Sequence, residues 1–144
     1  MKYALWLKAA AIFQFFTAGL HSIGIIVKPQ PENDTERQLL DLMHNYKFDL
    51  GAGFLHSMSD LMTSFSISFT LLLLFGGLLN WYLLRKRVEV KIMKGIIGIS
   101  CIIFGSCFLA MTFLTFLPPI ICTGLILLCL LMAYSTVPKQ QNAQ

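Results

Sequence analysis

Two histidines and an aspartate carry the most distinctive side-chain chemistry in this chain. His56 and Asp60 are four residues apart, so they share one face if their segment is helical. His21 lies in a separate apolar segment nearer the N-terminus. Imidazole and carboxylate groups together bind cations, relay protons or orient polar headgroups. Polar residues at helical spacing from these three complete a candidate pocket: His21, His56, Asp60, Ser64, Thr17 and Gln14.

Two histidines and a carboxylate also suit zinc or iron, which makes His21, His56 and Asp60 the candidate metal ligands. The chain has no H-E-x-x-H or C-x-x-C motif and no fixed ligand spacing. We therefore predict no metal site and no cofactor. Two other interpretations stay open. One is a pocket for a ligand or substrate; the other is a solvated His56–Asp60 pair, with His21 hydrogen-bonded inside a helix bundle.

Serine residues surround His56, and a serine near a histidine and an acid is the composition of a hydrolase site. Hydroxyls on membrane helices more often hydrogen-bond across or within helices, however. The chain also contains no nucleophile-elbow motif. We assign no catalytic residue and expect a non-enzymatic protein.

Long uncharged runs identify the elements that position these residues. Residues 9–27, 61–84 and 95–137 form runs of 19, 24 and 43 residues without a charge. A helix that crosses a bilayer needs about 20 apolar residues, and Pro118-Pro119 divides the longest run into two. Charged residues make up only 12% of the chain, against about 25% in soluble proteins. Four membrane spans follow.

We therefore predict an all-α fold, a bundle of four transmembrane helices. Residues 1–137 are expected to form a single membrane domain, and residues 138–144 a disordered cytoplasmic tail. The apolar run continues past Ala9–Ala11 to Val27, so the first helix is expected to be retained rather than cleaved. The predicted helices cover about 3–27, 54–84, 91–115 and 119–134.

The loop over residues 28–53 is predicted to contain a short amphipathic helix at about 36–50. Apolar residues recur there at helical spacing, which is typical of a helix on a membrane surface. Thr35 followed by Gln38 fits an N-terminal capping box.

Positive charge is concentrated in the short segment between the second and third spans. Short loops rich in lysine and arginine mark the cytoplasmic side, so both termini are predicted inside and the mainly acidic 28–60 segment outside. The net charge of +4 then meets anionic lipid headgroups, and no nucleic-acid partner is expected. The basic residues of this segment are Arg85, Lys86, Arg87, Lys91 and Lys94.

The predicted depths of the polar residues in the membrane suggest that two polar helix faces meet. Asp60 precedes Arg85 by 25 residues, roughly 37 Å of helix, so Asp60 reaches the outer headgroup level of a core about 30 Å thick. If the second helix is continuous from Asp49, Asp49, Gly53, His56, Asp60, Thr63 and Ser64 share one face. Gln14, Thr17, His21 and Lys28 share a face of the first helix. We predict that these faces meet in an outward-facing pocket, with His21 and Asp60 on facing surfaces.

Small residues line one side of the third helix: Gly95, Gly98, Cys101 and Gly105. Small residues let membrane helices approach closely, so this face is expected to pack within the monomer, with a homo-oligomer interface as the alternative. All four cysteines fall in predicted spans. We expect them to pack as small apolar groups, although Cys101 and Cys129 have similar depth and a thiol pair there stays open.

The stretch "NDTERQLLDLMHNYKFDLGAGFLHSMSDLMTSFSISF", the following "GGLLN" and the "GLHS" that contains His21 resemble an uncharacterised family of small bacterial integral membrane proteins. The resemblance covers most of residues 1–85 and implies a four-helix membrane protein of bacterial type. The architecture, though no specific motif, is also similar to DoxX-like four-helix proteins.

These features predict a multi-pass protein of the bacterial cytoplasmic membrane that acts as a non-enzymatic accessory, binding or small-solute-handling protein. Its expected partners are the lipid bilayer and either another membrane protein or a second copy. Two rival functions remain: a small transporter or channel component, and a membrane enzyme or redox protein that uses the histidine–aspartate cluster.

Overall fold

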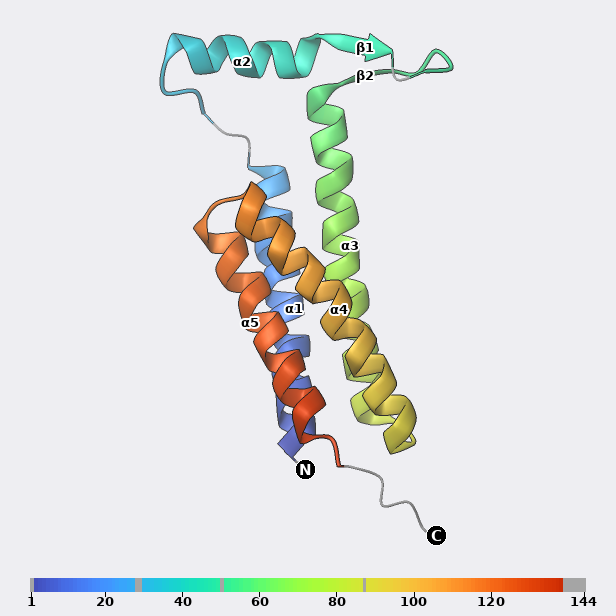
Figure 1. The fold of residues 1–144 in the computed structure, drawn as a ribbon. Coiled ribbons are helices and arrows are strands. Elements are labelled where there is room, and N and C mark those ends of the chain that lie inside the picture. The colour runs from blue at the N-terminus through green and yellow to red at the C-terminus, as the bar shows by residue number, and fades with distance from the viewer. Residues whose placement is uncertain (1, 28–29, 50, 87, 139–144) are drawn as a thin grey trace. The chain divides into compact units, whose positions relative to one another are not determined.

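The computed structural model describes residues 2–27, 30–49, 51–86 and 88–138, and within these the chain forms five helices and one small sheet (Figure 1). Four helices are long and apolar enough to cross a membrane: α1 (Lys2–Ile26), α3 (Met58–Arg85), α4 (Val90–Leu114) and α5 (Leu117–Thr136). The prediction of a helical protein with four candidate spans is confirmed, and these helices are compatible with a multi-pass membrane protein.

Between α1 and α3 lie the helix α2 (Asp34–Asn45) and the strands β1 (Lys47–Asp49) and β2 (Leu55–Ser57). The strands pair antiparallel, with Phe48 opposite His56. This small hairpin lies within the loop predicted over residues 28–53 and the start of the second predicted helix, where no strand was expected.

The condition for placing Asp49 and Gly53 on the same face as His56, a helix continuous from Asp49, is not met, and α2 and α3 are shorter than the predicted helices at about 36–50 and 54–84. The cause lies in the turn between the strands, where Gly51, Ala52 and Gly53 have φ values of 106°, 55° and 80°. A positive φ is incompatible with a right-handed helix and is readily adopted only by glycine. Three such residues in succession reverse the chain between the strands. α2 has already ended at Asn45, where Tyr46 becomes extended with a ψ of 117°, and α3 begins at Met58.

The capping box of α2 is also displaced from the predicted Thr35–Gln38 pair. Asn33 is the N-cap, and its side-chain oxygen accepts a hydrogen bond of 2.9 Å from the backbone N–H of Glu36. The Glu36 carboxylate accepts in return from the backbone N–H of Glu32 at 2.7 Å. Asparagine outranks threonine as an N-cap, which favours the earlier start. Several positions used in the sequence predictions lie outside the described residues: Lys28, Leu50, Arg87 and residues 139–144.

The described residues divide into two compact units: residues up to Thr17 with those from Leu73 onward, and Ala18–Leu72. In the first unit each helix buries residues three and four positions apart. This spacing defines one packed stripe per helix, as in bundles of membrane helices. The stripes comprise Leu7, Ala10, Ala11 and Gln14 of α1, Leu73, Gly76, Gly77, Asn80 and Leu83 of α3, Met93, Ile97, Ser100 and Phe104 of α4, and Thr123, Ile126, Leu130 and Ala133 of α5.

Gly76 is a point of close approach in this first unit. A Cβ atom added to Gly76 would lie 2.5 Å from Nε2 of Gln14 and 2.9 Å from Cζ of Phe104. Beside it, the amide of Asn80 donates a hydrogen bond of 2.8 Å to Oε1 of Gln14. Only a residue without a side chain fits there, so Gly76 lets α1 and α4 side chains pack against α3.

Only part of the predicted packing face of α4 contacts another described helix. Gly98 lies against the Tyr134 ring and Gly105 against Leu127, both on α5, whereas no atom lies within 4 Å of a Cβ added to Gly95. Cys101 is half-buried and Cys129 is buried, and both are free thiols, as are the other two cysteines. Antiparallel α4 and α5 lie side by side in Figure 1.

The second unit contains the end of α1, α2, the hairpin and the first part of α3. The chain turns sharply where β2 meets α3, so that α2 and β1 run across the N-terminal end of α3 (Figure 1). None of the α2 residues is buried, and Leu39 and Leu42 are 55% and 61% exposed. An apolar helix side is therefore open at the surface of this unit.

Candidate ligand-binding site

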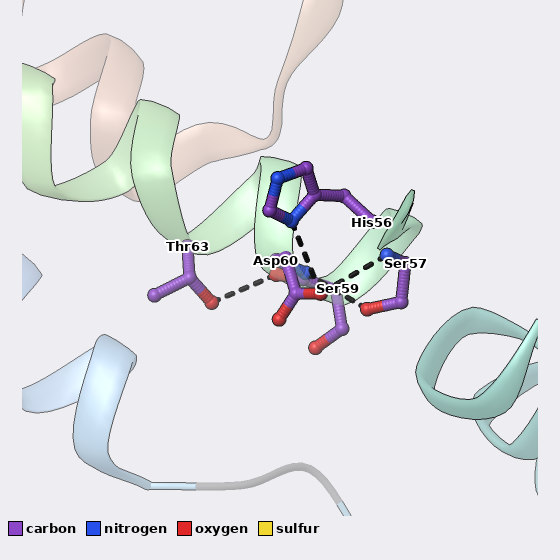
Figure 2. Close-up of polar contacts among 5 residues, drawn as sticks. All are labelled: His56, Ser57, Ser59, Asp60 and Thr63. Atoms are coloured by element: carbon purple, nitrogen blue, oxygen red, sulfur yellow. Dashed lines mark hydrogen bonds and ion pairs between the residues drawn. The ribbon is translucent and has the colours of Figure 1, made fainter. Parts of the chain in front are cut away.

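The N-terminus of α3 is held by a reciprocal pair of hydrogen bonds (Figure 2). The Ser57 hydroxyl accepts from the backbone N–H of Asp60 at 3.2 Å, and the Asp60 carboxylate accepts from the backbone N–H of Ser57 at 3.0 Å. This is a capping box, which satisfies two backbone donors that a helix start leaves free. The carboxylate also lies at the positive end of the helix dipole. Asp60 thus has a structural role that explains an acid at the start of an apolar helix.

His56 lies beside this capping box. It is the middle residue of β2, two positions before α3 begins. Its Nδ1 is 4.0 Å from the Asp60 carboxylate, and the two side chains are 47% and 58% exposed. The Phe54 ring stacks on the imidazole with ring centroids 6.4 Å apart. Exposed pairs of this kind contribute little to stability because water screens them. The geometry matches the solvated His–Asp pair among the predicted interpretations.

His21 contacts an aromatic ring rather than an acid. Its imidazole meets the Phe69 ring edge-on, with centroids 5.2 Å apart and an interplanar angle of 81°. Its Nε2 atom is buried and has no hydrogen-bond partner among the described residues. In the described part of the chain no group of three or more His, Cys, Asp or Glu side chains is arranged to hold a metal ion.

The remaining predicted pocket residues belong to two different units. Gln14 and Thr17 belong to the first unit, where both are buried, and Gln14 is paired with Asn80. Ser64 is exposed on α3, and its carbonyl accepts the Ser68 hydroxyl at 2.9 Å. His56 and Asp60 are therefore the predicted pocket residues joined by a polar contact, and a single pocket containing all six stays a prediction.

A hollow of about 260 Å³ lies in the second unit, on another side of α3. Its polar residues are His44 of α2 with Ser59, Thr63 and Ser66 of α3. The three hydroxyl residues recur at i, i+4 and i+7, so they share one face of the helix. Apolar side chains from α1, α2 and α3 complete the lining: Ile25, Val27, Leu40, Met43 and Met62.

The hydrogen-bond partners of His44 indicate which tautomer its neutral ring adopts. Its Nδ1 lies 2.9 Å from the carbonyl oxygen of Leu40, and a carbonyl only accepts, so Nδ1 carries the proton. In the neutral ring Nε2 is then the acceptor, and the Ser59 hydroxyl donates to it at 3.3 Å. The Thr63 hydroxyl donates to the Ser59 carbonyl at 2.8 Å (Figure 2). These bonds join α2 to α3 and orient two polar groups along the hollow.

His44, Ser59 and Ser66 were not among the site residues predicted from the sequence. The hydroxyl spacing on α3 was a detectable signal, but it was attributed to helix hydrogen bonding. His44 gave no such signal, because a helix extended to residue 50 and a helix continued from Asp49 both misplace it relative to α3. Only the turn at Gly51–Gly53 brings α2 across the start of α3.

The described lining of the hollow is polar but contains no carboxylate, lysine or arginine. It combines hydroxyl groups and the His44 imidazole with aliphatic and thioether side chains. Such a surface binds molecules that have both an apolar part and a hydrogen-bonding group.

Comparison of the chain with protein-family models, with curated proteins and with solved structures gave no match in any of the three.

Proposed function

We propose that this chain is a multi-pass protein of the bacterial cytoplasmic membrane that binds a small, uncharged amphipathic molecule in the hollow between α2 and α3. The observation that carries the proposal is the hydrogen bond between Ser59 and His44 Nε2, at the edge of a hollow whose described lining contains no carboxylate, lysine or arginine. The role is non-enzymatic: the protein presents, stores or hands over the ligand, as an accessory protein does.

The membrane orientation rests on the distribution of charge. Arg85, Lys86, Lys91 and Lys94 lie at or near the connection between α3 and α4, and short loops rich in such residues stay in the cytoplasm. Trp81 and Tyr134, at the same ends of α3 and α5, suit the aromatic belt of the interface. With this end inside, both termini are cytoplasmic, and α2 with its hollow is outside.

The exposed apolar side of α2 supports an interfacial location. Leu39, Leu42 and Tyr46 are all more than half exposed, while α2 also carries acidic and amide side chains. A helix with such a division of polarity lies in the plane of the membrane interface. The hollow below it would then open at the boundary between water and lipid, where amphipathic molecules partition.

The size of the hollow restricts the ligand. Its volume of about 260 Å³ is below the roughly 300–1,000 Å³ typical of sites for drug-sized molecules. The ligand therefore has fewer atoms than such molecules, with a hydroxyl or carbonyl group toward His44 and Ser59 and an aliphatic part toward Met43 and Met62.

Filling the hollow tests the proposal. Ser66→Leu places an aliphatic side chain in the hollow, so we expect small molecules that co-purify with the wild-type protein in mild detergent to be lost. Mass spectrometry of solvent extracts measures this loss. Ser68→Leu is the matched control, because Ser68 is exposed, lies two positions away on α3 and does not line the hollow. Equal recovery of the same molecules from both variants would refute binding at this site.

A second candidate function, acyl transfer, is favoured by the two hydrogen-bond contacts of the His44 ring. A serine hydroxyl that donates to an imidazole, itself oriented by a hydrogen bond from its other nitrogen, is the arrangement of an activated nucleophile. In that reaction Ser59 Oγ would attack an ester carbonyl, and His44 Nε2 would take the hydroxyl proton and return it to the leaving alkoxide.

A fluorophosphonate probe separates the two candidate functions. Acyl transfer predicts covalent labelling of the wild-type protein at Ser59, with the label absent in Ser59→Ala and strongly reduced in His44→Ala. Ser68→Ala is a control for the loss of a hydroxyl on α3 that does not line the hollow. A protein that binds its ligand without chemistry gives no labelled Ser59 in intact-mass measurements, and that result would remove the second candidate.

A further inference from the structure

The first unit carries a separate feature, a groove along α4 that ends at α5. Its volume is about 690 Å³, and its lining includes Lys91, Lys94, Gly95, Ile99, Ile102 and Tyr134. All belong to the first unit, so this groove is independent of the hollow at the start of α3.

The groove is basic at one end and apolar along the rest. Lys94 Nζ lies 5.1 Å from the centroid of the Tyr134 ring, a cation–π contact that holds the ammonium group at the groove edge. Lys91 is exposed one turn earlier. Neither lysine takes part in an ion pair within the described residues. Two positive charges therefore face the groove without a partner carboxylate.

The apolar part of the groove follows one side of α4. Lys91, Gly95, Ile99 and Ile102 recur at i, i+4, i+8 and i+11, so they form a single stripe. Ile99 and Ile102 are 59% and 72% exposed. Gly95 opens the stripe, because no atom lies within 4 Å of a Cβ added there.

The length of this stripe matches one leaflet of a membrane. Lys91 and Ile102 are 11 positions apart, or about 16 Å along a helix. Half of a hydrocarbon core about 30 Å thick is about 15 Å. With the lysines at the headgroup level, the stripe extends to the middle of the bilayer, which is the depth that one acyl chain occupies.

We propose that this groove is a binding site for a glycerophospholipid with an anionic headgroup. The phosphate lies between the ammonium groups of Lys91 and Lys94, and one acyl chain lies on Gly95, Ile99 and Ile102. Charge complementarity selects the anionic headgroup. The open apolar stripe distinguishes a lipid from free phosphate, because free phosphate has no acyl chain to contact the stripe. The proposal does not depend on the ligand of the hollow at α2.

The test measures lipid retention by the full chain purified in mild detergent. Phosphatidylglycerol and phosphatidylcholine with identical acyl chains are added at equal concentration, and native mass spectrometry records the lipid bound. We expect preferential retention of phosphatidylglycerol. A lysine near an anionic headgroup contributes about fivefold in affinity, so Lys91→Gln with Lys94→Gln should reduce this retention about thirtyfold. Lys2→Gln with Lys86→Gln removes the same charge outside the groove and should leave it unchanged.

Two further arms separate the possible occupants. Gly95→Leu keeps both lysines and fills the open stripe without a clash, so it should abolish retention of both lipids. Inorganic phosphate in excess should not displace phosphatidylglycerol. Retention by Gly95→Leu equal to wild type, or displacement by inorganic phosphate alone, would overturn the proposal. A lipid-free dimer that Gly95→Leu dissociates would also overturn it and assign the groove to a second copy of the chain.

Discussion

At the residue scale, the buried amides of Gln14 on α1 and Asn80 on α3 form a polar contact between two helices in the apolar interior of the first unit. One hydrogen bond joins them, while Nε2 of Gln14 and Oδ1 of Asn80 have no partner among the described residues. Hydrogen bonds between membrane helices contribute about 0.6 kcal/mol on average, so the pair contributes specificity more than stability. Its geometry depends on Gly76, because the Gln14 amide occupies the space a side chain would need.

Gly76→Ala should therefore destabilise the protein. The added Cβ would lie 2.5 Å from Gln14 Nε2 and 2.9 Å from Phe104, and overpacking of this kind costs about 1–3 kcal/mol. Thermal unfolding in detergent, followed by circular dichroism, measures the loss. Gly105→Ala is the matched control, since its Cβ would meet only Leu127 at an ordinary 3.7 Å. Equal stability of the two variants would contradict the close packing at Gly76.

At the element scale, the start of α3 depends on two local devices. The Ser57–Asp60 capping box stabilises the first turn, and the Gly51–Gly53 turn returns the chain so that β1 pairs with β2. Neither device involves a distant residue. Together they end the helical run of α2 and begin a new one, which determines where His44 lies along the start of α3.

Gly51→Ala should loosen the hairpin. Gly51 has a φ of 106°, and a side chain in the left-handed region costs roughly 1–2 kcal/mol per residue. Amide hydrogen exchange at Lys47–Asp49 and Leu55–Ser57 should then become at least about fivefold faster. Gly24→Ala serves as control, because Gly24 is helical and no atom lies within 4 Å of its added Cβ. Unchanged exchange in Gly51→Ala would contradict the turn geometry.

At the scale of the whole molecule, the central expectation is the membrane orientation inferred from charge. In a variant without native cysteines, Asn33→Cys should react with a membrane-impermeant maleimide on intact cells, because α2 is expected outside. Lys86→Cys should react only after lysis, since the connection between α3 and α4 is expected in the cytoplasm. Labelling of Lys86→Cys on intact cells, with Asn33→Cys protected, would establish the reverse orientation.

The described helices agree with the sequence wherever an apolar run is uninterrupted. α1, α4 and α5 begin and end within two residues of their predicted limits, because polar or proline-rich segments flank each run. The region between α1 and α3 was predicted less well. There the pattern of apolar residues continued through β1, so it indicated a longer helix. The positive φ values that prevent a continuous helix belong to a three-residue turn, and the spacing of apolar residues does not predict such a turn.

The sequence by itself determined the class of this protein: four long apolar helices with charge gathered between and beyond them. It could do so because the energy of a segment in a bilayer depends mainly on its own length and composition. Only the tertiary structure decided which polar groups meet. His44 and Ser59 are 15 residues apart, and Gln14 and Asn80 are 66 apart. Contacts between such positions depend on where each helix ends and how it is rotated about its axis. Both are determined by the packing of one element against another.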